Sequence, residues 1–192
     1  MTAPIAAIAV FCGASHGARH EYTAQAFNLG RAIASRGLTL VYGGGRAGLM
    51  GAVADASLGA GGRVIGVITE LLKGRELGHT GIHDLKVVPT MHERKMLMAD
   101  MADAFVALPG GLGTLDELFE ILAWAQLGIH TKPVGILNVE GYYDELMAFL
   151  DHVERENFLR LNHRTEVVFE RDVDALLDRL AHVRSAGARF PA

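Results

Sequence analysis

The chain has a single cysteine, Cys12, in 192 residues. One cysteine forms no disulfide within the chain and builds no cysteine-rich zinc site, and so low a count is typical of a reducing compartment. An excess of positive charge is also missing, because 18 Lys and Arg face 22 Asp and Glu, for a net charge of −4. Nucleic-acid binding draws on clustered positive charge that releases counterions, so this balance disfavours a nucleic-acid-binding protein.

Long apolar runs are scarce as well. The first one, Ile5–Cys12, is too short to cross a bilayer, and no positive residue precedes it. This argues against both a signal peptide and a membrane anchor, and with the cysteine count it predicts a cytoplasmic protein without membrane association. Half of the residues are hydrophobic, which is enough apolar surface to predict one compact domain over residues 1–192.

Short apolar runs alternate with amphipathic segments along the chain. Ile5–Phe11 is continuously apolar, as in a strand covered on both faces, and the segment after it has apolar residues at helical spacing and stops at Gly37. Further strands are expected at Leu38–Tyr42, Arg63–Ile68, Leu85–Val88, Ala104–Leu108, Val134–Leu137 and Val167–Phe169. Further helices are expected at Leu49–Ala60, Met91–Met101, Leu115–Leu127, Tyr142–Glu156 and from about Asp172. The alternation predicts a Rossmann-like α/β fold, a doubly wound parallel sheet in a three-layer α/β/α arrangement.

Three glycine-bearing loops follow strands of this predicted sheet, at residues 12–17, 43–48 and 109–114. Glycine lets a ligand approach the backbone, and each loop leads into a helix whose free N–H groups and dipole favour an anion. Parallel sheets bind ligands beyond the carboxyl ends of their strands, where these loops lie. We therefore expect a ligand that carries phosphate.

The second loop allows a different interpretation. Gly43, Gly45 and Gly48 match the G-x-G-x-x-G pattern of dinucleotide-binding proteins, and Glu70 follows at a suitable distance. The match, however, comes after the second strand and not the first, and the chain has 23 glycines. The pattern therefore favours NAD binding only weakly, and the lack of a lysine beside Thr114 argues against a P-loop NTPase.

The third loop ends in Thr114-Leu-Asp-Glu117, which has the form of a capping box. In that interpretation Thr114 caps the helix and Glu117 only stabilises its start. The alternative is that the carboxylate of Glu117 handles sugar hydroxyls, orients water or stabilises developing positive charge. The residues alone leave both open.

Arg94 and Lys95 lie near the start of a predicted helix, where the helix dipole disfavours cations. A bound phosphate would explain their position. The alternative is that these cations form a solvated charge pair with Glu93 or Asp100, which would contribute little energy.

Metal and cofactor chemistry have weaker support. His16 with His20 and His79 with His83 have i,i+4 spacing, but glycines intervene and no carboxylate partner is evident. The four lysines include none that is identifiable as a Schiff-base residue for pyridoxal phosphate. We expect neither a metal nor a cofactor.

The motifs together resemble the LOG (Lonely Guy) family of cytokinin riboside 5'-monophosphate phosphoribohydrolases. The matching segments are Phe11–Gly13, Val41–Gly45, Gly48–Gly51, Met91–Lys95, Pro109–Thr114 with Glu117, Trp124–His130, Lys132–Gly135 and Gly141–Tyr143. They follow one another in order over about four fifths of the chain. The M-H-E-R-K and P-G-G-x-G-T-x-x-E motifs are the most specific.

The resemblance implies a homodimer that hydrolyses the N-glycosidic bond of cytokinin riboside 5'-monophosphates and AMP, releasing the free base and ribose 5-phosphate. It implies a catalytic pair, Arg94 and Glu117. The substrate-binding residues that it implies, besides that pair, are Gly43, Gly44, Gly45, Met91, Lys95, Pro109, Gly110, Gly111, Leu112, Gly113 and Thr114.

This chain departs from the family's usual residues at Ala14, Thr69 and Asp116, where serine, proline and glutamate are usual. The same fold is also similar to molybdenum cofactor carrier proteins, so a binding protein without turnover is the alternative function. A carrier would not be expected to need Arg94 and Glu117 together.

Overall fold

The computed structural model describes residues 3–75, 78–159 and 167–186. In these residues seven parallel strands form one sheet in the order β4-β3-β2-β1-β5-β6-β7. The strands are β1 Ala7–Phe11, β2 Thr39–Tyr42, β3 Val64–Thr69, β4 Asp84–Val88, β5 Ala104–Ala107, β6 Val134–Leu137 and β7 Val167–Glu170. The chain builds outward from β1 to β4 and then returns to place β5 on the other side of β1. This reversal makes the β1/β5 boundary the switch point at which such sheets bind ligands.

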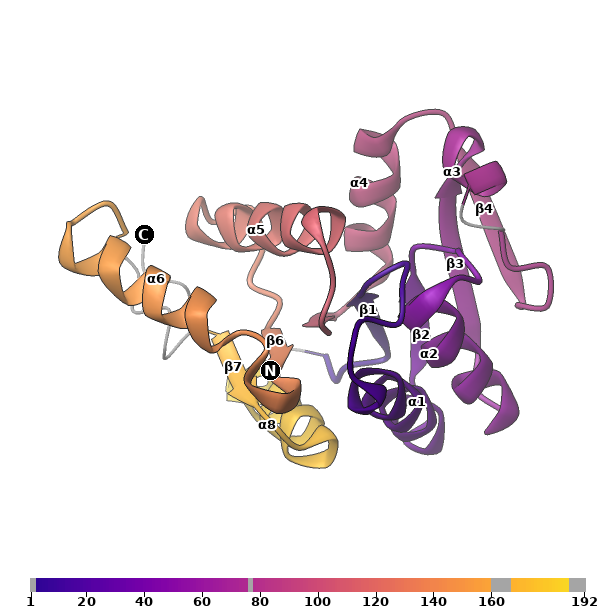
Figure 1. The fold of residues 1–192 in the computed structure, drawn as a ribbon, viewed down its shortest axis with the longest axis horizontal. Coiled ribbons are helices and arrows are strands. Elements are labelled where there is room, and N and C mark those ends of the chain that lie inside the picture. The colour runs from indigo at the N-terminus through magenta and orange to yellow at the C-terminus, as the bar shows by residue number, and fades with distance from the viewer. Residues whose placement is uncertain (1–2, 76–77, 160–166, 187–192) are drawn as a thin grey trace.

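Helices cover both faces of the sheet (Figure 1). On one face lie α1 His20–Ser35, α2 Gly48–Gly59 and α8 Val173–Ala186, which bury Leu29, Val53 and Leu176 in one apolar core. On the other lie α4 Met91–Met101 and α5 Leu112–Gln126, which bury Met98 and Leu118 in a second core. The predicted doubly wound, three-layer fold is confirmed.

Three elements complete the described chain: α3 Glu70–Arg75, the 3-10 helix η1 Val139–Gly141 and α6 Asp144–Arg155. The short α3 and η1 were not predicted, because neither is long enough to display an apolar period. Among the described residues, no helix has the length and apolar content needed to cross a membrane.

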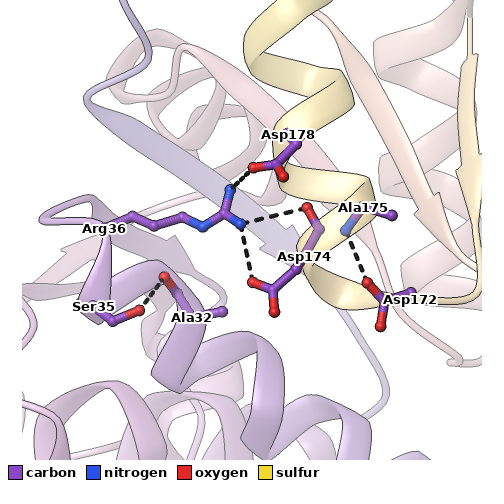
Figure 2. A network of polar contacts seen from close by, with 7 residues as sticks. All are labelled: Ala32, Ser35, Arg36, Asp172, Asp174, Ala175 and Asp178. Carbon is purple, nitrogen blue, oxygen red and sulfur yellow. Dashed lines mark hydrogen bonds and ion pairs between the residues drawn. The ribbon is translucent and has the colours of Figure 1, made fainter.

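Arg36, just after α1, connects this helix to α8 (Figure 2). Its Nη1 lies 2.7 Å from Oδ1 of Asp178, and its Nη2 lies 2.9 Å from Oδ1 of Asp174. Asp172 in turn accepts a hydrogen bond from the backbone N–H of Ala175 in the first turn of α8, at 2.9 Å. The network therefore orients α8 against α1, on the sheet face opposite α4 and α5.

Candidate functional site

The three glycine loops meet at the β1/β5 switch point. The backbone N–H of Gly13 donates to the carbonyl of Pro109 at 3.0 Å, and the carbonyl of Gly13 accepts from the N–H of Leu49, also at 3.0 Å. Gly48 has a φ of +58°, and a Cβ on it would lie 2.3 Å from the backbone nitrogen of Ser15. Glycine is therefore required where the first and second loops cross.

This crossing argues against the dinucleotide interpretation. The carbonyl of Gly13 occupies the first turn of α2, where a dinucleotide fingerprint would place its pyrophosphate. Glu70 forms a 4.0 Å ion pair with Lys73 in α3. It is absent from the described residues that line the cavity at the switch point.

That cavity has a volume of about 180 Å³. Seven residues implied by the resemblance line it: Gly43, Met91, Arg94, Gly111, Gly113, Thr114 and Glu117. Five further residues line the cavity, although the resemblance did not imply them as binding residues: Val10, Cys12, Gly13, Ala14 and Met50. The first glycine loop was a signal for Cys12, Gly13 and Ala14, and Met50 lies in the matching segment Gly48–Gly51, whereas nothing in the sequence singled out Val10 as a binding residue.

The other implied residues lie around this cavity, and in the described part of the chain they are not among its lining residues: Gly44, Gly45, Lys95, Pro109, Gly110 and Leu112. Gly44 has a φ of +74° and accepts a hydrogen bond from the N–H of His79 at 2.9 Å. A Cβ on Gly110 would lie 2.1 Å from Oγ1 of Thr114. These two glycines therefore shape the loops to which they belong.

The N-terminus of α5 opens into the cavity. The helix begins at Leu112 with Gly111 as its N-cap, and the N–H of Leu115 makes the first i→i−4 hydrogen bond, to Gly111 at 3.1 Å. The N–H groups of the three preceding residues come before that ladder and have no acceptor within the helix. With the positive end of the helix dipole they form a site for an anion.

Thr114 is not the N-cap of this helix, so of the two interpretations left open by the sequence the capping box was wrong. The helix starts earlier than the predicted Leu115, and Thr114 is buried in its first turn, 3% exposed. Glu117 lies in the next turn and lines the cavity. Glycine has a low helix propensity, yet the helix begins among glycines. Gly110 is needed there because the loop approaches the backbone nitrogen of Gly13 closely. An unpredicted cap forms at Thr90, whose Oγ1 accepts from the N–H of Glu93 at 3.2 Å.

The side chain of Arg94 is 5% exposed. Its Nε donates to the carbonyl of Val67 at 2.9 Å and its Nη2 to the carbonyl of Gly43 at 2.8 Å, while Nη1 lies 3.8 Å from Sδ of Met91. A side chain this buried is not solvated, so the alternative of a solvated charge pair was wrong for Arg94. Two carbonyl groups, one within β3 and one directly after β2, accept hydrogen bonds from this cation and so stabilise it near the start of α4.

Lys95 connects α4 to α5. Its Nζ lies 3.0 Å from Oδ2 of Asp116 and 3.1 Å from Oε2 of Glu120. Desolvation lowers the pKa of Lys95, but the hydrogen bonds and charges of the two carboxylates outweigh it and raise the pKa above its ordinary value. Lys95 is therefore a cation throughout the neutral range and ties together the two helices that carry Arg94 and Glu117.

The remaining lysines also have partners. Lys132 donates from Nζ to the carbonyl of Ala99 at 2.7 Å, and desolvation lowers its pKa. Lys86 pairs with Asp84 at 2.8 Å. Within the described ranges no lysine lines the cavity, so the geometry lacks the lysine that a Schiff base with pyridoxal phosphate would need.

The histidine pairs do not form a metal centre in the described residues. His79 is buried, and its Nε2 lies 2.9 Å from Oδ1 of Asp55, while its Nδ1 accepts from the N–H of Gly81 at 3.1 Å. His16 contacts Oγ1 of Thr23 at 3.0 Å. Residues 3–75, 78–159 and 167–186 contain no group of three His, Cys, Asp or Glu side chains placed to hold a metal ion.

The cavity combines an anion site at the start of α5 with the guanidinium of Arg94 and the carboxylate of Glu117. Such a site can hold a phosphate ester and catalyse a reaction at the group that the phosphate is attached to. Comparison with known proteins places the chain in a family. A family model described as "Possible lysine decarboxylase" matches residues 50–180.

Two curated relatives are similar over most of the chain. The chain is 50% identical over 173 residues to a probable cytokinin riboside 5'-monophosphate phosphoribohydrolase of Oryza sativa subsp. japonica, covering 90% of this chain and 76% of that protein. It is 47% identical to a cytokinin riboside 5'-monophosphate phosphoribohydrolase of Arabidopsis thaliana, covering 90% of this chain and 81% of that protein.

Among solved structures, the molybdenum cofactor carrier protein of Chlamydomonas reinhardtii superposes with a TM-score of 0.70 at 22% identity, covering 93% of this chain and 98% of that one. At this identity the likeness shows the shared fold alone. The sequence relatives go further: the chain belongs to the LOG family of cytokinin riboside 5'-monophosphate phosphoribohydrolases.

Proposed function

We propose that this protein hydrolyses the N-glycosidic bond of cytokinin riboside 5'-monophosphates and of AMP, giving the free base and ribose 5-phosphate. The observation that carries the proposal is that Arg94 and Glu117 line one cavity with the N-terminus of α5. The printed activity of the sequence relatives, at 47–50% identity, supports it.

The geometry suggests how a nucleotide lies in the site. The phosphate binds the N–H groups at the start of α5, where the helix dipole favours negative charge. The cavity, at about 180 Å³, is smaller than the roughly 300–1,000 Å³ that encloses a whole drug-sized ligand. It therefore holds the sugar phosphate, and the base lies at its mouth, beside the half-exposed side chain of Met91.

Glu117 faces the ribose in this arrangement. Breaking the bond between C1′ and the base nitrogen generates oxocarbenium character on the sugar, which a carboxylate stabilises while it orients the attacking water. The water delivers hydroxide to C1′ and its proton is released, and the departing base gains a proton.

Arg94 acts at the same centre as a fixed cation. Its guanidinium is too basic to serve as an ordinary general acid. Held by the carbonyls of Val67 and Gly43, it anchors the ligand and stabilises the negative charge that develops as the bond breaks.

The direct test is an assay of products. The purified protein is incubated with AMP and, separately, with N6-isopentenyladenosine 5'-monophosphate, and free base and ribose 5-phosphate are quantified by chromatography. Adenosine and isopentenyladenosine serve as controls without the phosphate. We expect base and ribose 5-phosphate in equal amounts from the monophosphates and much less from the nucleosides. Tight binding of the monophosphates without any product would contradict the proposal and favour a carrier.

We further propose a homodimer in the cytoplasm. Apolar side chains exposed on the neighbouring helices α4 and α5, namely Met96, Leu112 and Phe119, support self-association. The single cysteine, buried Cys12, suits a reducing compartment. Light scattering coupled to gel filtration tests the oligomeric state, and a mass of about 20.6 kDa would contradict the dimer.

A further inference from the structure

We propose that Tyr142 and Tyr143 are positioning residues that hold the Pro109–Gly111 turn in the conformation that binds phosphate. The inference rests on the proposed function, because it assumes that the phosphate of the substrate binds at the start of α5. It assigns a role to the Gly141-Tyr-Tyr143 motif, which matches the family but lies outside the cavity.

The two tyrosine hydroxyls donate to carbonyls on either side of Pro109. Tyr143 donates to the carbonyl of Leu108 at 2.7 Å, and Tyr142 donates to the carbonyl of Gly110 at 2.5 Å. The carbonyl between them, that of Pro109, accepts from the N–H of Gly13 at 3.0 Å. The three consecutive carbonyls of Leu108, Pro109 and Gly110 are therefore held by donors from elsewhere in the chain.

Holding a carbonyl also aims the N–H that follows it. In a planar trans peptide the C=O and the next N–H point in opposite directions. The bond from Gly13 thus sets the N–H of Gly110, and the bond from Tyr142 sets the N–H of Gly111, a residue that lines the cavity. Pro109 has no N–H, so the bond from Tyr143 to Leu108 acts by fixing the residue from which the turn starts. Without these bonds the glycines would sample many backbone conformations, and several of those would turn a carbonyl dipole toward the phosphate.

The tyrosines are themselves held firmly. The side chain of buried Asn138 accepts from the N–H of Tyr143 at 2.8 Å and donates to Oδ1 of Asp144 at 2.6 Å. The rings of Tyr142 and Tyr143 pack edge to face with their centroids 4.9 Å apart, and the ring of Tyr22 packs against that of Tyr142 with a centroid distance of 5.6 Å. Burial raises the pKa of Tyr143, so its hydroxyl keeps the proton that it donates.

The test uses Tyr142→Phe and Tyr143→Phe, each with a matched control. Tyr42→Phe is the control for buried Tyr143, because the hydroxyl of Tyr42 is buried without a hydrogen-bond partner in the described chain. Tyr22→Phe is the control for half-exposed Tyr142, because the ring of Tyr22 packs against the ring of Tyr142. Calorimetry measures Kd for ribose 5-phosphate and for adenosine, kinetics gives kcat and KM for AMP, and a thermal melt reports Tm.

Loss of one neutral hydrogen bond that aims the turn is expected to weaken ribose 5-phosphate binding about 3- to 10-fold. The KM for AMP should rise by a similar factor, with adenosine binding unchanged and both controls at the wild-type values. Unchanged Kd for ribose 5-phosphate in both variants would overturn the inference, as would an equal loss for adenosine. If the variants lose ribose 5-phosphate binding but the wild type does not hydrolyse AMP, the positioning role stands and the proposed function fails.

Discussion

Nη2 of Arg94 lies 2.8 Å from the carbonyl oxygen of Gly43. A Cβ on Gly43 would come within 2.3 Å of the same nitrogen, so the glycine is what lets the guanidinium reach the end of β2. With the second bond, from Nε to the carbonyl of Val67, this contact fixes the side chain at the cavity. The position of the proposed catalytic cation thus depends on the planar fork of an arginine.

Arg94→Lys should therefore impair the protein although it keeps the charge. An ammonium cannot donate to both carbonyls in the geometry of the fork, and each buried carbonyl left without a donor costs about 1–3 kcal/mol. We expect a similar loss in the free energy of unfolding, measured with urea, and a fall in kcat/KM of about 10²-fold. Arg63→Lys, at an exposed position, is the control. Arg94→Lys activity within twofold of wild type would refute the anchoring role.

Glu117→Gln should abolish most of the hydrolysis while leaving the fold intact. Glutamine has nearly the same shape but neither stabilises an oxocarbenium ion nor orients water as a carboxylate does, and we expect kcat to fall by about 10²- to 10⁴-fold. The matched control is Glu145→Gln, which makes the same change at an exposed position of α6 outside the cavity lining. Equal kcat values for Glu117→Gln and wild type would reduce Glu117 to a structural residue.

Gly110→Ala should disturb the phosphate-binding loop. Its Cβ would lie 2.1 Å from Oγ1 of Thr114 and 2.9 Å from the nitrogen of Gly13. Because one of these atoms belongs to the backbone, the loop has to shift, and we expect at least a tenfold rise in the KM for AMP together with a loss of about 1–3 kcal/mol in stability. Gly59→Ala, where a Cβ meets nothing within 4 Å, should leave KM unchanged. A wild-type KM for Gly110→Ala would show that the turn tolerates displacement.

The stability of the protein should fall with acid through His130. Its Nε2 donates to the carbonyl of Ile121 at 2.9 Å, and its Nδ1 accepts from the N–H of Lys132 at 3.1 Å. This bonding suits the neutral ring, and desolvation lowers the pKa of His130 below its ordinary value of 6.5.

Because the unfolded chain takes up this proton at a higher pH than the folded one, the contribution of His130 is fully present above pH 6.5. It is lost as the pH falls from there to the lowered folded pKa. Urea titrations from pH 8 to pH 5 should show a smaller decline in His130→Gln than in the wild type, with exposed His92→Gln as the control. Identical pH profiles for wild type and His130→Gln would contradict this assignment.

Much of the architecture could be predicted from sequence because apolar runs such as Ile8–Phe11 have to be covered on both faces. The position of Arg94 in the molecule could not. Its partners are carbonyls of Val67 and Gly43, which carry no residue-type signal and lie far away along the chain. Local pattern also misplaced the start of α5, since the capping rule at Thr114 ignores the tertiary contact between Gly110 and Gly13.

A structure of the Glu117→Gln variant with AMP bound would test the central claim most directly. We expect the phosphate at the N–H groups of Gly111–Thr114, the C1′ atom between residue 117 and the guanidinium of Arg94, and the base toward Met91. A nucleotide seated elsewhere, or one whose ribose lies beyond the reach of both side chains, would contradict the account.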